Sequence, residues 1–425
     1  MDMNELLTIN LPRLQAMIDV SSKIGALADG GLCRLALSNE DKAMRDIFVN
    51  WLQDAGLTVR VDDFGNIYGR RKGKKPGAAP VMIGSHLDTQ PAGGKFDGIL
   101  GVLAGLEVVH VLNDHHIETE HPIEIVSFTN EEGARFQPPM LGSGGIAGVF
   151  EKDFILGRKD KEGRRFDEEL KRVGYFGSAE DRPKDIHRYL ELHIEQGPVL
   201  EKENFPVAAV EGISGMTWIE VTVTGESNHA GPTPMVMRRD ALVVTAKMIS
   251  VINQLVRVLD EDLTATTGQI KISPNVINCI PSTAVFSVDV RHPQDSVRGK
   301  AISMIQEKIA TIAASGGVTV STNVIWDIAA TQFSQEIISY VYAGSTAHGY
   351  PVRSMISGAG HDAKYMNDIV PSAMIFVPSV KGRSHCQEEF TRWEDIEKGV
   401  NVLLYTVQAL AQKTEERVDY HADGS

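Results

Sequence analysis

Hydrophobic and polar positions follow an α/β pattern in the first half of this chain. Short apolar runs, such as VMIG at 81–84 and IEIVSF at 123–128, predict buried strands. Between these two runs, residues 97–114 are apolar enough to predict a covered helix. Before them, residues 40–56 predict an amphipathic helix. Strands that alternate with helices are typical of a mostly parallel sheet with helices on both faces. We therefore expect the α/β fold class.

A different pattern follows Gly212. Alternating positions predict strands and amphipathic stretches predict helices, in the order strand, helix, strand, strand, helix, strand. The segments are 215–227, 238–259, 268–274, 283–293, 295–315 and 318–326. This is the order of a ferredoxin-like α+β unit. Because the α/β pattern resumes near residue 330, we predict a discontinuous domain of 1–212 and 328–425, with 213–327 inserted into it.

The composition restricts the classes of partner that the protein is expected to bind. The chain has 425 residues, which is more than one ordinary hydrophobic core organises. Its formal net charge of −14 disfavours nucleic acid, because phosphate binding needs a basic patch. No run of 18 apolar residues is present, so we expect no membrane span. A small-molecule partner fits these exclusions best.

The expected location is the cytoplasm. The N-terminal sequence MDMNELLTINLPRLQAM lacks the basic region and apolar core of a signal peptide. Cys33, Cys279 and Cys386 lie far apart and form no CxxC pair, as is typical of a protein kept reduced.

Carboxylate and imidazole side chains follow four of the predicted strands. The segments are VMIGSHLDT with GGKFDG, IEIVSFTNEEG, YLELHIEQG and SAMIFVPS with GRSHCQEE. They supply His86, Asp88, Asp97, Glu131, Glu132, His193, Glu195 and His385. Functional residues of open α/β sheets collect at the carboxyl ends of the strands. A pair of divalent ions needs several such ligands from different elements, so the pattern indicates a two-metal hydrolytic site.

The spacing within two segments suggests roles. His86 and Asp88 form a His-x-Asp, whose side chains point the same way in extended backbone, so that Asp88 could fix the metal-binding tautomer of His86. Asp97 lies in a Gly-rich turn, where its carboxylate could bridge two ions. Glu131 and Glu132 are adjacent and would point apart, so that one could bind metal while the other acts as general base.

Each segment also has an ordinary structural interpretation. A lone His-x-Asp is typical of a solvated loop pair, and two adjacent glutamates can simply be solvated after a strand. His193 could be a buried structural histidine, and His385 an exposed loop histidine. The recurrence of the same placement in four segments favours the metal site.

The motifs around these residues resemble those of a known enzyme family. They are GSHLDT, GGKFDGILGVLAGLEV, NEEGARF, ELHIEQGPVLE, GESNHAGPTPM, RRDAL, NVINCIP, DVRHP and SGAGHDA, followed by the IFVPS and SH segments. They resemble the metal-dependent amidohydrolase/peptidase family that includes aminoacylases and carboxypeptidases. Within it, the chain is most similar to the hydantoinase/carbamoylase branch, which contains N-carbamoyl-L-amino acid hydrolases, β-ureidopropionase and allantoate amidohydrolase.

The resemblance implies a fold and a metal site. The fold would be a zinc-peptidase-like α/β/α sandwich with an inserted ferredoxin-like lid that also makes a homodimer. His86, Asp97 and His193 would hold one divalent ion, and Asp97, Glu132 and His385 a second, with Asp97 bridging. Zinc is the first expectation, and manganese, cobalt or nickel would suit the same ligands.

The resemblance also implies catalytic roles. Glu131 would be the general base, and Asp88 would orient His86. His229 would reach in from the lid, often from the other subunit, to stabilise the developing oxyanion. Without the resemblance, His229 is a surface histidine in a turn.

Substrate selection would fall to five further residues. Arg291, at a predicted strand end, would grip a carboxylate bidentately, and Asn278 would hydrogen-bond the same carboxylate. Gln196 would hydrogen-bond a ureido group. Gly360 and His361 of SGAGHDA would line the pocket, although this segment could equally be a flexible turn.

Two features keep alternatives open. Arg291 could be a surface arginine paired with Asp289 or Asp295. Cys386-Gln387 stands where relatives usually carry Asn-Pro or a similar pair, which puts the local loop shape in doubt.

The implied reaction is hydrolysis of a ureido C–N bond. The substrate would be an N-carbamoyl-L-α-amino acid or N-carbamoyl-β-alanine, and the products the amino acid, ammonia and carbon dioxide. Allantoate is the close alternative, and an N-acylamino acid or a dipeptide a more distant one. A non-catalytic binding protein on the same scaffold would be expected to lack a ligand or the base, and this chain has all of them.

Overall fold

The computed structural model describes residues 6–28 and 30–413 and divides the chain into two compact units. The first consists of Met1–Glu211, Phe333–Met355 and Gly360–Ser425, and the second of Gly212–Gln332 and Ile356–Ala359. The segment predicted as an insertion, 213–327, lies within the second unit.

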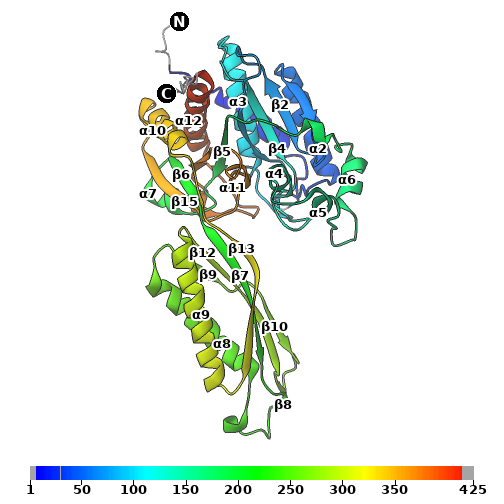
Figure 1. Ribbon diagram of the computed structural model, residues 1–425, viewed down its shortest axis with the longest axis vertical. Helices are drawn as coiled ribbons and strands as arrows, with labels where there is room; N and C mark the ends of the chain where they lie inside the picture. Colours follow the sequence, from blue (N-terminus) through cyan, green and yellow to red (C-terminus); the bar gives the residue numbers. More distant parts are fainter. Residues whose placement is uncertain (1–5, 29, 414–425) are drawn as a thin grey trace, which may run out of the picture. The chain divides into compact units, whose positions relative to one another are not determined.

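The first unit is built on a mixed sheet in the order β1-β2-β4-β3-β5-β16-β6 (Figure 1). The strands are β1 (Thr58–Val61), β2 (Ile67–Arg71), β3 (Val81–His86), β4 (Ile123–Phe128), β5 (Arg188–Ile194), β6 (Val207–Ile213), β15 (Val352–Ser357), which pairs with β6, and β16 (Ser372–Val377). The four central strands, β4, β3, β5 and β16, run parallel. β3, β4 and β16 are buried along their whole lengths, as parallel strands covered on both faces should be.

Helices cover both faces of this sheet. Leu192 of β5 packs toward α12 (Trp393–Gln412), where a Cβ on Gly399 would lie 3.3 Å from its Cδ1. The neighbouring Glu191 accepts a hydrogen bond from Ala363 N in α11 (Asp362–Met366). Because successive strand residues face opposite sides, α12 and α11 lie on opposite faces.

The other helices of the first unit surround this core. They are α1 (Leu11–Ser21), α2 (Asn39–Asp54), α3 (Ile99–Asp114), α4 (Leu141–Ile146), α5 (Lys152–Leu156), α6 (Phe166–Val173), α7 (Val199–Glu203) and α10 (Gln335–Ala347), with the 3-10 turns η1 (Ala179–Asp181) and η3 (Val380–Gly382). α3 is buried on nearly every side, which explains why its sequence has no polar face.

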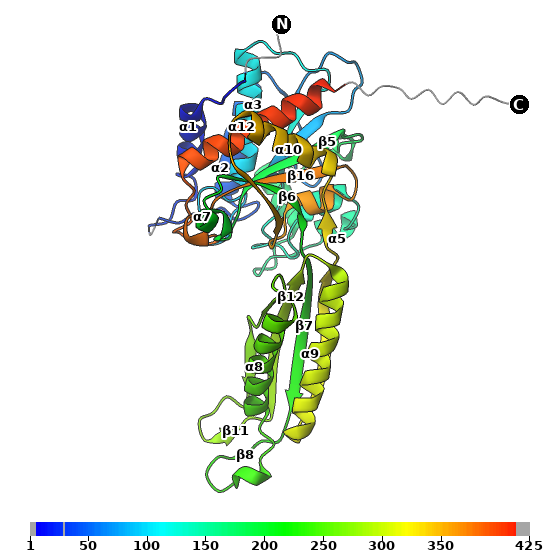
Figure 2. The same cartoon turned by 90° about the vertical axis from the view of Figure 1, so that its left-hand side faces the viewer.

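The second unit is an antiparallel sheet with two helices side by side along it (Figure 2). In chain order its main elements are β7 (Gly215–Thr224), α8 (Ala241–Leu259), β10 (Ile270–Ser273), β12 (Thr283–His292), α9 (Asp295–Ser315) and β13 (Thr319–Ile328). The sheet order is β10-β12-β7-β13, and β9 (Thr264–Thr266) also pairs with β12. Smaller elements are β8 (Asn228–His229), η2 (Met235–Met237), β11 (Cys279–Ile280) and β14 (Thr331–Gln332). β7 and β12 alternate buried and partly exposed residues, because one face packs against the helices.

Among the described residues, one helix, α8, is long and apolar enough to cross a membrane by length and composition alone. A core helix passes the same test. α8 buries Val244, Met248, Ile252 and Val256 in the hydrophobic core of the second unit, together with Phe286 of β12.

Candidate metal centre

The predicted ligands meet at one edge of the first unit's sheet. His86 ends β3, His193 lies one residue before the end of β5, and Glu131 follows β4 by three positions. His385 lies in the loop after β16. Because β4, β3, β5 and β16 are parallel neighbours, their carboxyl ends lie along the same edge.

Asp97 is the centre of two groups of side chains. Its Oδ1 lies 3.1 Å from His193 Nε2 and 3.7 Å from His86 Nε2. Its Oδ2 lies 3.3 Å from His385 Nε2, which is also 3.5 Å from Glu132 Oε2. Each group could hold one metal ion, and Asp97 belongs to both.

Gly98 makes the packing of His86 against the Asp97 turn possible. Its φ of +69° is in the left-handed region, and a Cβ there would lie 2.2 Å from His86 Cε1. A glycine is therefore required by both backbone and space. The turn leads directly into α3 at Ile99.

Asp88 supports the site differently from the expected His-x-Asp contact. His86 Nδ1 lies 2.9 Å from the backbone carbonyl of Asp88 but 3.9 Å from its carboxylate, so the carbonyl fixes the imidazole. The carboxylate instead accepts the backbone N–H groups of Glu131 and Glu132, each at 3.2 Å. β3 ends at His86, so the extended geometry that would align the two side chains does not continue to Asp88.

The adjacent glutamates face different partners. Glu131 Oε2 lies 3.4 Å from His86 Nε2, whereas Glu132 faces His385. Gln90 donates to Glu132 from its backbone N–H at 3.1 Å and from its side-chain amide at 2.7 Å. The Glu131 carboxylate stays beside the first group.

The electrostatics of the site favour a bound cation. Burial and the charge of Asp362 raise the pKa of Glu131 well above its usual range, and burial with the charge of Asp97 raises the pKa of Glu132 to about 8. Burial alone would raise the pKa of Asp97, but hydrogen bonds from His193 and His385 hold it well below its usual range. Crowded, buried carboxylates repel one another, and a divalent cation relieves that repulsion.

The imidazoles respond to the same charges. Burial lowers the pKa of His86 to about 4, so this ring is neutral and able to coordinate. Burial opposes protonation of His193, but its hydrogen bond to Asp97 outweighs burial and raises its pKa to about 9. The hydrogen bond to Asp97 likewise raises the pKa of His385 to about 9. Imidazole nitrogens and carboxylate oxygens in groups of three are a donor set that fits zinc, manganese, cobalt or nickel.

Gln196 and His361 adjoin these groups. Gln196 Nε2 donates to Asp97 Oδ2 at 2.9 Å and lies 3.3 Å from Ser384 Oγ and from His385 Nε2. Its buried Oε1 has no hydrogen-bond partner among the described residues. The ring of His361 packs edge-on against His193 at a centroid distance of 4.5 Å, and the preceding Gly360 is exposed.

Glu195, the remaining carboxylate of the strand-end segments, caps a helix. It accepts the backbone N–H groups of Val199 at 2.7 Å and Leu200 at 2.9 Å, at the start of α7. It is therefore not part of either group.

Three non-glycine residues of the site have left-handed backbone. The φ angles are +60° at Asn130, +57° at Gln196 and +55° at His385. Such conformations cost on the order of 1–3 kcal/mol each and persist where the surrounding structure enforces them. Each one presents a site side chain or directly precedes one, which is the pattern of a functional edge.

The other predicted site residues belong to the second unit. Arg291 of β12 pairs with Asp289 at 2.7 Å and donates to Gly358 O at 2.7 Å, whereas Asp295 pairs with Arg298. The structural alternative for Arg291 is thus present with Asp289.

His229 and Asn278 lie together on exposed backbone away from Arg291. His229 of β8 pairs with Cys279 of β11, and Asn278 O accepts the N–H of Ala230. Both adjoin the end of β12 at Thr283. Arg291 lies eight residues further along that strand, about 26 Å away at ~3.3 Å per residue.

The comparisons with known proteins agree with this site. The chain matches the model described as peptidase family M20/M25/M40 over residues 82–409. The chain belongs to this family. It is 39% identical over 407 residues to an N-carbamoyl-L-amino-acid amidohydrolase of Rhizobium meliloti, covering 96% of this chain and 98% of the relative. It is 33% identical over 398 residues to an allantoate amidohydrolase of Bacillus subtilis, covering 93% and 96%.

A solved structure of the same branch is also similar. A crystal structure of a hydantoinase/carbamoylase family amidase from Burkholderia multivorans has a TM-score of 0.91 and 44% identity, covering 96% of this chain and 99% of that one. The predicted resemblance is confirmed. M20 family members are metal-dependent, and the chain is a hydrolase of the amidohydrolase type that acts on C–N bonds with a mixed α/β fold.

Several supporting residues of this M20 site carry no local sequence signal. Glu191 accepts hydrogen bonds from Ser85 Oγ at 2.8 Å and from Ala363 N at 2.9 Å, beneath the histidines. Glu389 and Ser384 contact the Asp97 turn from the His385 loop. The only available hint was that Glu191 precedes His193 by two residues, and so shares its face of the strand.

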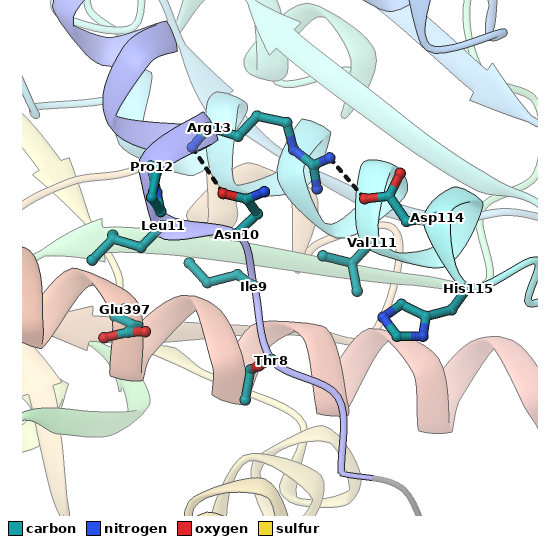
Figure 3. A pocket seen from close by; sticks show the side chains of 10 residues that line it. All are labelled: Thr8, Ile9, Asn10, Leu11, Pro12, Arg13, Val111, Asp114, His115 and Glu397. Carbon is teal, nitrogen blue, oxygen red and sulfur yellow. Dashed lines mark hydrogen bonds and ion pairs between the residues drawn. The ribbon is translucent and has the colours of Figure 1, made fainter.

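A cavity of ≈ 410 Å³ lies apart from the metal-binding groups, between the N-terminal segment, α3 and α12 (Figure 3). There Arg13 forms an ion pair with Asp114 at 2.7 Å, and its backbone N–H donates to Asn10 Oδ1 at 3.2 Å. No residue of the two metal-binding groups lines this cavity. It therefore adds nothing to the hydrolytic site.

Proposed function

We propose that this protein hydrolyses the ureido C–N bond of N-carbamoyl amino acids, and that it uses two divalent ions. The substrate is an N-carbamoyl-L-α-amino acid or N-carbamoyl-β-alanine. Water adds to the carbonyl carbon, the bond to the amino acid nitrogen breaks, and the carbamic acid released decomposes to carbon dioxide and ammonia. The relative from Rhizobium meliloti, named for this activity, supports the proposal.

The two ions would be held by the groups that share Asp97. His86, Asp97 and His193 form one group, and Asp97, Glu132 and His385 the other. Divalent ions there would supply Lewis acidity for the carbonyl and lower the pKa of water toward neutral. Zinc is our first choice, because borderline imidazole and carboxylate ligands suit it.

Glu131 is the proposed general base. It would accept the proton of the attacking water and pass it to the leaving nitrogen. Its carboxylate lies beside His86, and its backbone N–H is held by the carboxylate of Asp88. Burial of that carboxylate next to other acids favours its taking up a proton.

The observation that carries the ureido substrate is the unpartnered oxygen of Gln196. Its Nε2 donates to Asp97 Oδ2 and to Ser384 Oγ, so its Oε1 points away from them and is buried without a donor among the described residues. The terminal NH₂ of a carbamoyl group can supply that donor, and the methyl group of an acetyl group cannot. A buried acceptor left unpaired costs about 1–3 kcal/mol, which discriminates against N-acyl substrates.

We further propose that Arg291, His229 and Asn278 complete the site, and that the second unit serves as a ferredoxin-like lid and dimerisation domain. Three of the five N–H groups of Arg291 are engaged with Asp289 and Gly358, which leaves others for a substrate carboxylate. One copy cannot bring both ends of β12 to a single small substrate. We therefore assign Arg291 to one subunit of a homodimer and His229 with Asn278 to the other, in line with the expectation that His229 often comes from the other subunit.

The close alternative substrate is allantoate, supported by the relative from Bacillus subtilis. An N-acylamino acid or a dipeptide is more distant, since neither carries an NH₂ directly on the scissile carbonyl for Gln196 to accept from. A non-catalytic binding protein is disfavoured because Glu131 and all five ligands are present together. A cytoplasmic location remains our proposal for this homodimer.

The test is ammonia release from three ureido substrates, with deacetylation of an N-acetyl amino acid as the comparison. N-carbamoyl-L-α-amino acids and N-carbamoyl-β-alanine should release ammonia with metal loaded and not after chelation, and allantoate should be slower. Deacetylation of the matching N-acetyl amino acid should have a kcat/KM about 10- to 100-fold lower. Absence of ammonia from all ureido substrates would refute the proposal, and fastest release from allantoate would replace it with the alternative.

The role of Gln196 has its own measurement. Gln196→Leu removes the acceptor oxygen. It should lower the ratio of kcat/KM for the N-carbamoyl amino acid to kcat/KM for the N-acetyl amino acid. An unchanged ratio would exclude Gln196 as the discriminating residue.

A further inference from the structure

Glu389 links two segments that carry metal-binding residues, and it has no assigned role. It is 4% exposed. Its Oε1 accepts the backbone N–H groups of Phe96 at 3.2 Å and Asp97 at 3.1 Å. Its Oε2 lies 2.9 Å from Ser384 Oγ, next to His385. One buried carboxylate therefore joins the Asp97 turn to the His385 loop, which is 288 positions away (385 minus 97).

The Asp97 turn is shaped to admit this carboxylate. A Cβ on Gly94 would lie 2.2 Å from Glu389 Oε1 and 2.4 Å from its Cβ. Any other residue at position 94 would displace Glu389. Gly94 is therefore explained by the side chain that it accommodates, rather than by a left-handed backbone.

The His385 loop needs such an anchor. His385 has a φ of +55°, and its side chain is 49% exposed, the most exposed of the candidate ligands. Within the loop, Glu389 N donates to Cys386 O at 3.1 Å, which closes a turn directly after the ligand. Ser384 Oγ also lies 3.1 Å from Asp97 Oδ2. The contacts of Ser384 and Glu389 thus fix where His385 lies relative to Asp97.

The two imidazoles of the other metal-binding group do not depend on this loop. His86 and His193 lie in β3 and β5, which are neighbours in the sheet and hydrogen-bonded to each other. Asp97 is also held by Gln196 Nε2 at 2.9 Å, and its carbonyl accepts Ile99 N at 2.8 Å. Loss of Glu389 should therefore loosen one group much more than the other.

We propose that Glu389 is a positioning residue that sets the metal affinity of the Asp97–Glu132–His385 group, with little effect on the His86–Asp97–His193 group. This inference rests on the two-ion part of the proposed function. It does not depend on which substrate is hydrolysed.

The experiment measures metal binding without substrate. The full-length chain is stripped with a chelator and titrated with Zn²⁺ against a chromophoric competitor, so that two dissociation constants are resolved. We assign the larger of the two dissociation constants to the Asp97–Glu132–His385 group, because its His385 is the most exposed ligand. Glu389→Ala should raise that dissociation constant about 10- to 100-fold, the range for a residue that orients a ligand. The smaller dissociation constant, that of the His86–Asp97–His193 group, should stay within about threefold of the wild-type value, because the sheet holds the two imidazoles of this group.

Two further variants test the reason for the effect. Glu389→Gln keeps an oxygen for the amides of Phe96 and Asp97 and an NH₂ that can donate to Ser384, so it should restore nearly wild-type constants. Glu388→Ala is the matched control, because Glu388 is half-exposed and pairs with Arg383. Both constants should be unchanged in that variant.

Specific outcomes overturn the proposal. Unchanged constants in Glu389→Ala would do so, as would an equal loss at both groups. If thermal unfolding shows that Glu389→Ala does not fold, Ser384→Ala decides, because it leaves Glu389 bonded to the Asp97 turn and removes the hydroxyl that joins the His385 loop to Glu389, Asp97 and Gln196. Ser384→Ala should also raise the dissociation constant of the Asp97–Glu132–His385 group. An unchanged constant would exclude a role for the contact between Ser384 and Glu389.

The result is separable from the proposed substrate. A wild-type chain that binds two Zn²⁺ ions but releases no ammonia would refute the ureido reaction and leave the role of Glu389 intact. A wild-type chain that binds a single ion would overturn the role of Glu389.

Discussion

His86, Asp97 and His193 of the first unit are at most 4% exposed and contact one another, whereas His229 and Asn278 of the second unit lie on exposed backbone. The first set is held by strand ends, by Gly98 and by the carbonyls of Asp88 and Ile194. The second set sits on a two-residue pairing between β8 and β11. The side chains proposed to bind an ion are fixed in advance, and those proposed to meet a substrate are left accessible.

The difference follows from what each set would bind. A metal ion tolerates ligand displacements of only a few tenths of an ångström, so its ligands need rigid support. A substrate must first enter, so residues that contact it last are best carried on a separate element. The packed core of the second unit gives those exposed residues a firm base.

The largest effect is expected within the fixed set. Glu131→Gln should lower kcat on the order of 10²–10⁴-fold, because the amide cannot take the proton of water. Metal content, measured by elemental analysis, should not change. Glu132→Gln is the matched variant, since the adjacent residue is a proposed ligand, and it should lose metal. Full activity in Glu131→Gln would remove the general base from this site.

The accessible set should affect substrate binding more than chemistry. Arg291→Ala should raise KM for a carboxylate-bearing substrate about 10- to 100-fold, the value of hydrogen bonds to a charged group. Arg291→Lys should recover part of the loss, because it keeps the charge without the bidentate fork. Arg257, exposed on α8, provides the control for removing a charge from the same unit. Steady-state kinetics measure these KM values. An unchanged KM in Arg291→Ala would show that Arg291 does not bind the substrate carboxylate and only pairs with Asp289.

The smallest change in activity is expected when two variants are mixed. This experiment tests whether His229 and Arg291 of one active site come from different subunits. Assayed at a substrate concentration well below KM, His229→Ala and Arg291→Ala homodimers should each retain little activity. Mixing and reassociating them should restore about a quarter of wild-type activity, because half of the dimers are mixed and each mixed dimer has one intact site. No recovery, with mixed dimers shown by mass spectrometry, would place both residues on the same subunit.

Much of the fixed set could be predicted from the sequence, because strand ends are visible in local patterns. A short apolar run followed by His86 or by Glu131-Glu132 indicates both the strand and the edge on which its ligands lie. The helix at 295–315 has the predicted bounds. α8 begins at Ala241 rather than 238, because Asp240 accepts the N–H groups of Leu242 and Val243 as a cap.

The supporting contacts could not be predicted in the same way. The link from Glu389 to Asp97 joins segments 292 residues apart, and its only local trace is a glycine at position 94. The carboxylate of Asp88 turns toward two backbone amides because the strand stops at His86. Both depend on the direction of the backbone after regular structure ends, which hydrophobic periodicity does not encode.

The sharing of Asp97 by residues from four strand ends ties metal binding to folding. His86 and His385 are 299 positions apart (385 minus 86), so an unfolded chain presents no site. Any cation that binds the assembled set stabilises the whole first unit, by about 2.7 kcal/mol when the free ion is at 100 times its dissociation constant. The melting temperature of this protein should then depend on metal concentration, and its lifetime in a cell on metal supply.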